Sequence, residues 1–179
     1  MRLILLSVIV WPSLVSATWT EMSVWKVGAQ LNLVGDQEIN QAAMEWNPAF
    51  GLEVGLEFEP WSLGIAWRHM NAEAESGNYR VETNQERLML NGRRSWHGDS
   101  DWLAWVQASV GVQWHKVNFE LGSSRASESS DQELVSGLGL GFGWPLEPSW
   151  RSELSTLVHQ TQTRSAIEAS ASVSLVYLY

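Results

Sequence analysis

The chain has 179 residues, 20 acidic and 11 basic side chains, a formal net charge of −9 and no cysteine. Proteins that bind nucleic acid need a basic surface, so this balance argues against a nucleic-acid partner. The absence of cysteine excludes disulfides and thiolate metal sites, and the four histidines show no paired spacing of metal ligands, so we expect no metal and no cofactor.

The N-terminus has the three parts of a secretory signal peptide. Arg2 supplies the positive charge, residues 3–11 form a short apolar run, and residues 15–17 offer small side chains for cleavage. The apolar run is too short for a membrane-spanning helix, which needs about 20 apolar residues. We therefore expect residues 1–17 to be removed and residues 18–179 to form a single domain.

Apolar and polar residues alternate in eight segments of the remaining chain. This period of two is typical of β-strands, whose successive side chains point to opposite faces. Nine charged side chains fall on the face opposite the apolar one, which is the pattern of a barrel with lipid outside and polar groups inside. Arg94 is an exception and falls on the lipid-facing side of its segment. The segments cover residues 25–33, 50–58, 61–68, 87–96, 102–115, 137–144, 150–159 and 169–179.

The connections between these segments alternate in length. Short connections at residues 59–60, 97–101 and 145–149 take turns with longer polar stretches, predicted as loops, at 35–47, 70–80, 120–133 and 161–167. Short turns on the periplasmic side and longer external loops are typical of outer-membrane barrels, in which strand numbers are even. We predict an all-β fold, a transmembrane antiparallel up-and-down β-barrel of about eight strands.

Aromatic side chains gather at the ends of the predicted strands. Amphipathic rings prefer the boundary between membrane and water, so two aromatic girdles are expected in such a barrel. The girdle beside the short turns comprises Trp61, Trp96, Trp102, Trp144, Trp150, Tyr177 and Tyr179. The opposite girdle comprises Trp46, Phe50, Trp67, Trp114 and Phe119.

The predicted interior carries nearly balanced charges. An unpaired charge in so narrow a barrel is costly, so we expect a linked network of ion pairs. Its members are Lys26, Glu53, Glu57, Arg68, Arg87, Arg93, Arg151, Glu153 and Glu168. The alternative is a narrow pore or proton path lined by Glu53 and Glu57, for which eight strands leave little room.

Four glycines share the inward face between Gly137 and Gly143. Glycine removes side-chain volume and eases bending of a strand. The row either lets the wall curve and receives a bulky inward group such as Trp105, or lines a cavity for an acyl chain. The sequence leaves both interpretations open.

The predicted external loops are mildly acidic. Lipopolysaccharide is also anionic, so contact between the two would require bridging divalent cations held by carboxylate oxygens. The serines between residues 123 and 130 predict a mobile tip for the third loop. The acidic residues of the first and third loops are Asp36, Glu38, Glu45, Glu120, Glu128, Asp131 and Glu133.

One set of residues leaves an enzymatic alternative open. His159 and Thr161, followed by Glu168, are similar in order to the His-x-Ser pair and downstream Glu of outer-membrane lipid A deacylases, with threonine in place of serine. That resemblance implies acyl transfer, with His159 as the base, Thr161 as the nucleophile and Glu168 orienting the histidine.

The final strand carries the most specific signal. Residues 169–179 alternate strictly and end on Tyr179, and this end resembles the terminal strand of bacterial outer-membrane barrels. The whole pattern is similar to the small OmpX and OmpA transmembrane-domain group. The resemblance implies a bacterial outer-membrane address, recognition of the C-terminal strand by the barrel-assembly machinery, and contact with outer-membrane lipid and lipopolysaccharide. It further implies a monomer with a structural, envelope-integrity or surface-interaction role and no catalysis.

Overall fold

The computed structural model describes residues 24–37, 45–76, 79–98, 101–121, 124–161 and 167–179, and the predicted signal peptide lies outside them. These residues form nine strands and include no helix that is long and apolar enough to cross a membrane. The strands are β1 (Val24–Gln37), β2 (Glu45–Phe58), β3 (Trp61–Ser76), β4 (Tyr79–His97), β5 (Leu103–Leu121), β6 (Ser124–Ser129), β7 (Glu133–Glu147), β8 (Trp150–Thr161) and β9 (Ile167–Leu178).

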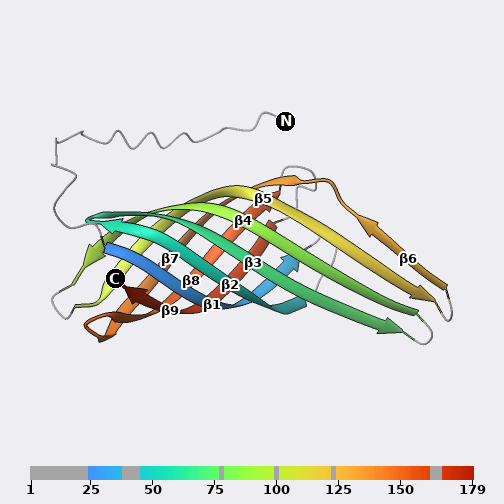
Figure 1. Ribbon diagram of the computed structural model, residues 1–179, viewed down its shortest axis with the longest axis horizontal. Coiled ribbons are helices and arrows are strands. Elements are labelled where there is room, and N and C mark those ends of the chain that lie inside the picture. Colours follow the sequence, from blue (N-terminus) through green and yellow to red (C-terminus); the bar gives the residue numbers. More distant parts are fainter. Residues whose placement is uncertain (1–23, 38–44, 77–78, 99–100, 122–123, 162–166) are drawn as a thin grey trace.

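Eight of the strands close into an antiparallel barrel (Figure 1). Neighbours in the chain pair with each other from β1 to β5, β5 pairs with β7, and β7, β8 and β9 continue the wall. The barrel closes where β1 meets β9, from Lys26 opposite Leu178 to Gln37 opposite Ile167. The predicted fold, an up-and-down barrel of eight strands, is therefore confirmed.

The alternation of side chains divides the wall into a polar inner face and an apolar outer face. On β9, for example, Ser170, Ser172 and Ser174 are buried inside while Val173 and Leu175 are exposed outside. Large apolar side chains stay exposed on every strand of the barrel. Such a surface is unfavourable in water and matches the lipid-facing band of a membrane barrel.

The row of glycines on β7 receives large side chains from neighbouring strands. A Cβ atom on Gly141 would lie 2.1 Å from the ring of Trp105, and one on Gly139 would lie 2.7 Å from Leu157. Both distances are too short for real contacts. Trp105 and Leu157 therefore take the volume that the glycines leave free, as in the first of the two interpretations of this row.

A four-stranded sheet projects beyond the barrel at the end opposite the short turns (Figure 1). We call it the protruding sheet; each strand contributes six residues, 71–76 of β3, 79–84 of β4, 116–121 of β5 and 124–129 of β6. The pairing of β3 with β2 ends at Met70, before this sheet begins.

The protruding sheet corrects the predicted loops at 70–80 and 120–133. Residues 70–76, 79–80 and 124–129 are strand, and β5 continues to Leu121. Past the lipid, the outward face of the strands turns polar, so these segments lose the outward apolar face that marks a membrane strand although the backbone pairing continues. The predicted mobile serine tip was also wrong in part, because Ser124, Ser127 and Ser129 belong to β6.

Two predicted positions change with these strand boundaries. Glu133 is not a loop residue: it opens β7 and is buried on the inward face. Phe119 does not share the outward face of Trp114, because five residues separate them on one strand and an odd separation puts two side chains on opposite faces.

Candidate functional site

The barrel interior holds two clusters of charged side chains, and the first lies toward the short turns. Glu53 is its centre, with Lys26 Nζ 2.7 Å from Oε1 and Arg93 Nη2 donating to Oε2 at 2.7 Å. Arg93 Nη1 reaches Glu153 Oε2 at 3.0 Å. These four residues come from four different strands, β1, β2, β4 and β8, so the cluster ties the wall together across its interior.

Arg151 extends this cluster toward the turns. Its Nε donates to Glu153 Oε1 at 2.8 Å, and its two terminal nitrogens donate to Glu57. Three cations and three carboxylates therefore meet in one cluster, and their formal charges cancel. Charge-assisted hydrogen bonds of this kind are the strong ones, which offsets the cost of removing the groups from water.

The second cluster lies nearer the protruding sheet and is built around Arg87. Its two terminal nitrogens donate to Glu168 at 2.7 and 2.6 Å, and Nε and Nη2 donate to Gln113 Oε1 at 3.1 and 2.6 Å. Arg68 Nη1 and His159 Nδ1 lie 3.8 and 3.7 Å from Glu168 Oε1. Each of the nine charged residues predicted for the interior thus points inward, and the structure distributes them over two clusters.

Two residues of the second cluster were missed by the sequence analysis. Gln113 joins Arg87 to Glu133, because its Nε2 donates to Glu133 Oε2 at 3.0 Å. The acidic character of the stretch around Glu133 suggested a loop. The alternation of the strand could have identified Glu133 as an inward residue, since Glu133, Val135 and Gly137 share one face of β7.

Side chains fill the described interior. Arg87, Lys26, His159 and Glu153 are among the most deeply buried large residues, each less than about 2 % exposed. A cavity of about 20 Å³ between the two clusters is lined by Arg68 and Arg93, which is room for roughly one water molecule. This arrangement is that of a plugged barrel, and it gives no support to a pore along Glu53 and Glu57.

The three residues of the enzymatic alternative all face the interior. His159 and Thr161 are buried on β8, and Glu168 is bound by Arg87. His159 Nδ1, at 3.7 Å from Glu168, is too far away for a hydrogen bond. A lipid in the surrounding membrane would meet the outer face of β8 and could not reach these groups, so the geometry does not favour acyl transfer.

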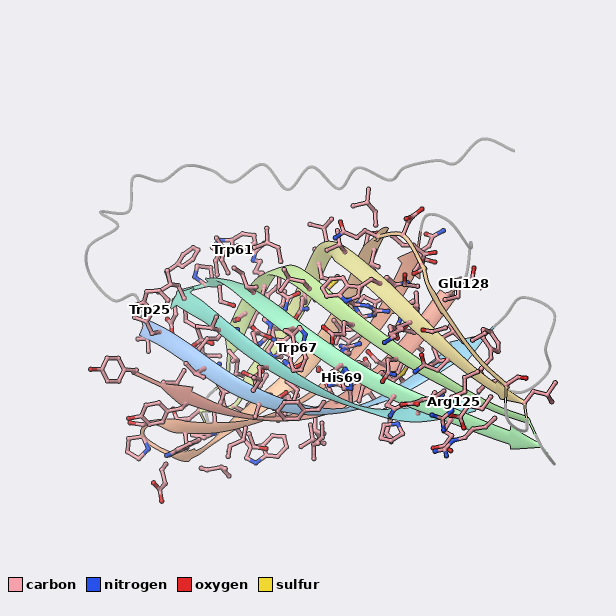
Figure 2. The ribbon with its side chains drawn as sticks, turned by 45° about the vertical axis from the view of Figure 1, so that its right-hand side comes forward. Trp25, Trp61, Trp67, His69, Arg125 and Glu128 are labelled. Atoms are coloured by element: carbon pink, nitrogen blue, oxygen red, sulfur yellow. The ribbon has the colours of Figure 1, made fainter. Side chains whose placement is uncertain are left out.

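The aromatic residues of the first girdle surround the barrel at the level of the short turns. Figure 2 shows Trp25 and Trp61 together at that end, far from Arg125. Rings of neighbouring strands contact each other, with Trp102 stacked on Phe142 at 5.3 Å between centroids and Trp150 near Tyr177 at 4.9 Å. Trp144 contacts Phe142 at 6.1 Å between centroids, Trp96 and Trp61 share a contact with Arg94, and Tyr179 is largely exposed.

The second girdle is represented by an aromatic group on β2 and β3. Trp67 contacts Phe50 edge-on at 6.3 Å and stacks on His69 at 6.0 Å between ring centroids. The Trp67 indole also donates to Glu86 Oε2 at 3.3 Å. The side chain of Trp46 lies outside the part of the chain that is described.

Among the described residues, no group of three histidine or acidic side chains is arranged to hold a metal ion. The predicted loop at 35–47 is shorter than expected, because Asp36 on β1 and Glu45 on β2 are strand residues that pair with each other. Their side chains, and the whole of Glu38, lie outside the described part of the chain.

A closed antiparallel barrel of eight strands, apolar outside and polar inside, is the architecture of the small outer-membrane β-barrel proteins, and this chain has that fold. No protein-family model and no curated protein sequence matches the chain. The relationship therefore rests on structure alone.

Three solved structures show the likeness. Neisserial surface protein A aligns with a TM-score of 0.68 and 9 % identity over 88 % of this chain and 99 % of its own. The attachment invasion locus protein Ail of Yersinia pestis aligns with a TM-score of 0.60 and 12 % identity over 88 % of this chain and 97 % of its own. A major outer membrane protein of Thermus thermophilus aligns with a TM-score of 0.60 and 10 % identity over 88 % of this chain and 99 % of its own. These neighbours and the exposed apolar band agree with the predicted address in the bacterial outer membrane.

Proposed function

We propose that this protein is a non-enzymatic barrel of the bacterial outer membrane whose protruding sheet binds extended protein segments at the cell surface. One observation carries the proposal: in the described chain β6 pairs only with β5, so its outer edge presents backbone groups without a partner strand. An exposed sheet edge is a template for an added strand.

The two faces of the protruding sheet differ in chemistry. On one face, ion pairs join neighbouring strands, Arg80 to Glu73 at 2.5 Å and Arg125 to Glu120 at 2.8 Å. The opposite face is mostly apolar. It includes Val81 on β4, Val117, Phe119 and Leu121 on β5, and Ala126 on β6.

This difference selects the kind of segment that would bind. A strand added beside β6 would place alternate side chains beside Ser124, Ala126 and Glu128, at the border of the apolar face, and the others beside Arg125, Ser127 and Ser129. The expected partner is therefore an extended segment held mainly through its backbone, with apolar side chains at alternate positions on the side of the apolar face. The structural likeness to the attachment invasion locus protein of Yersinia pestis supports a role at the surface.

A designed probe tests this proposal. A fluorescent ten-residue peptide of alternating valine and threonine should raise its anisotropy with the purified barrel, whereas the same peptide methylated on alternate backbone nitrogens should not. Adjacent residues of an edge strand point their N–H groups in opposite directions. One of the two substitutions Ser127→Pro and Glu128→Pro therefore removes a backbone N–H that points away from β5. At least one of these variants should lose binding, and equal binding of both peptides would contradict strand addition.

We further propose that the barrel is a monomer surrounded by lipid and lipopolysaccharide, and that the assembly machinery recognises β9. Closure between β1 and β9 leaves the barrel wall complete within one chain. The terminal ring of Tyr179 is 86 % exposed and free to be recognised. Tyr179→Ala should lower the fraction of heat-modifiable, folded protein in the membrane, and an unchanged fraction would contradict this role.

A further inference from the structure

One cation faces the lipid at the turn end of the barrel. Arg94 lies on β4 with its side chain exposed on the outer face, while its neighbour Arg93 points inward. Its outward neighbours across the sheet are Trp61 on β3 and Val106 on β5. Among the described residues of the turn end, no other lysine or arginine faces outward, so Arg94 is distinct from the interior network.

The surroundings of Arg94 are aromatic, with no described carboxylate within ion-pair distance. Its guanidinium carbon lies 5.6 Å from the ring centroid of Trp61 and 5.6 Å from that of Trp96. The nearby carboxylate of Glu59 instead lies 3.5 Å from His97. Cation–π contacts hold a guanidinium in place but leave its N–H donors without acceptors.

The depth of the residue decides what can supply those acceptors. A lipid-facing arginine costs about 2–4 kcal/mol at the bilayer midplane and about 0–1 kcal/mol near the interface. Trp61 and Trp96 belong to the girdle, which places Arg94 at the level of the lipid headgroups. The planar guanidinium of an arginine can donate two parallel hydrogen bonds to the oxygens of one phosphate.

We propose that Arg94, held between Trp61 and Trp96, binds the phosphodiester of a glycerophospholipid in the leaflet at the turn end. The site would anchor the barrel at a fixed depth through one lipid headgroup. The proposal requires the barrel to span a membrane but does not depend on strand addition at β6, so either can fail alone.

Solid-state NMR on the full chain tests the contact directly. In phosphatidylglycerol vesicles, dephasing of guanidinium ¹⁵N by lipid ³¹P should give an arginine signal that Arg94→Gln removes. The matched control is Arg125→Gln, which changes an arginine of the protruding sheet that already pairs with Glu120 and should leave the signal intact. Trp61→Leu with Trp96→Leu should weaken it while Arg94 remains.

Two controls accompany this experiment, one for folding and one for the source of the phosphate. Heat-dependent gel mobility of each variant reports folding, and an Arg94→Gln protein that does not fold is replaced by Arg94→Lys, which keeps the charge but has no guanidinium and should also remove the dephased arginine signal. In maltoside micelles with inorganic phosphate the signal should be absent. The proposal is overturned if Arg94→Gln leaves the dephased signal unchanged, or if inorganic phosphate reproduces it.

Discussion

Arg87 and Glu168 are 81 residues apart in the chain and meet inside the barrel through two hydrogen bonds of 2.7 and 2.6 Å. The pair joins β4 to β9, two strands that are not neighbours in the wall. Gln113 and Glu133 continue the connection to β5 and β7. The interior thus links strands that backbone pairing does not link.

Removing one member of this pair should destabilise the barrel strongly. Glu168→Gln leaves Arg87 as a buried cation without its carboxylate, and breaking a buried pair typically costs about 3–5 kcal/mol. The measurement is the free energy of unfolding in urea, in vesicles. The exposed pair Arg125–Glu120 is the control, because Glu120→Gln should change that free energy by less than about 1 kcal/mol. Equal losses of unfolding free energy from the two substitutions would contradict a larger contribution of the buried pair to stability.

A methyl group on Gly141 should also destabilise the fold. The new Cβ would lie 2.1 Å from the Trp105 ring, and overpacking of this kind costs about 1–3 kcal/mol. Gly92→Ala is the control, since its nearest neighbour would be 3.7 Å away. Thermal unfolding of both variants measures the difference, and adding Trp105→Phe to Gly141→Ala should recover part of the loss. A Gly141→Ala barrel as stable as Gly92→Ala would contradict this packing.

Two leucines with the same exposure separate the lipid-facing surface from the water-facing one. Leu140 on β7 and Leu121 at the tip of β5 are each 62 % exposed. Leu140→Arg should cost about 2–4 kcal/mol, because the charge enters lipid near the middle of the barrel wall. Leu121→Arg places the same charge on the protruding sheet in water, where surface substitutions usually change stability by less than about 0.5 kcal/mol. Urea unfolding in vesicles should therefore distinguish them, and similar losses would mean that both positions meet the same solvent.

The buried interior predicts that the barrel does not conduct ions. Arg87, Lys26 and Glu153 are almost inaccessible to water and occupy both levels of the interior. Purified protein in a planar bilayer should therefore give no stable conductance step, while a porin incorporated under the same conditions should. A reproducible unitary conductance that depends on the amount of protein would contradict a plugged interior.

The sequence predicted the wall of the barrel well because lipid imposes a simple rule on it. Each residue of β9 from Ala169 to Tyr177 faces the side that its parity indicates, since a strand in lipid must expose one apolar face. The protruding sheet does not follow this rule. Beyond Trp67 the outward residues of β3 are polar, so the outward apolar parity that identifies a lipid-facing strand ends there although the strand continues.

The partners inside the barrel could not be predicted for a different reason. Parity shows that Arg87 and Glu168 both point inward, but their contact depends on the stagger of β4 relative to β9 across the barrel. That stagger is set by the register of all the intervening strands. The alternating chain therefore predicts which residues enter the interior, and the closed structure decides which of them meet.

The central claim is that the chain spans the outer membrane with the protruding sheet outside and the short turns in the periplasm. The chain contains no cysteine, so single cysteines can be introduced without background labelling. Ser127 lies on β6 and Ser149 in the turn before β8. With a membrane-impermeant maleimide, Ser127→Cys should be labelled on intact cells, and Ser149→Cys only after the outer membrane is permeabilised. The account is contradicted if Ser149→Cys is labelled on intact cells while Ser127→Cys is protected, or if both variants are recovered in the soluble fraction.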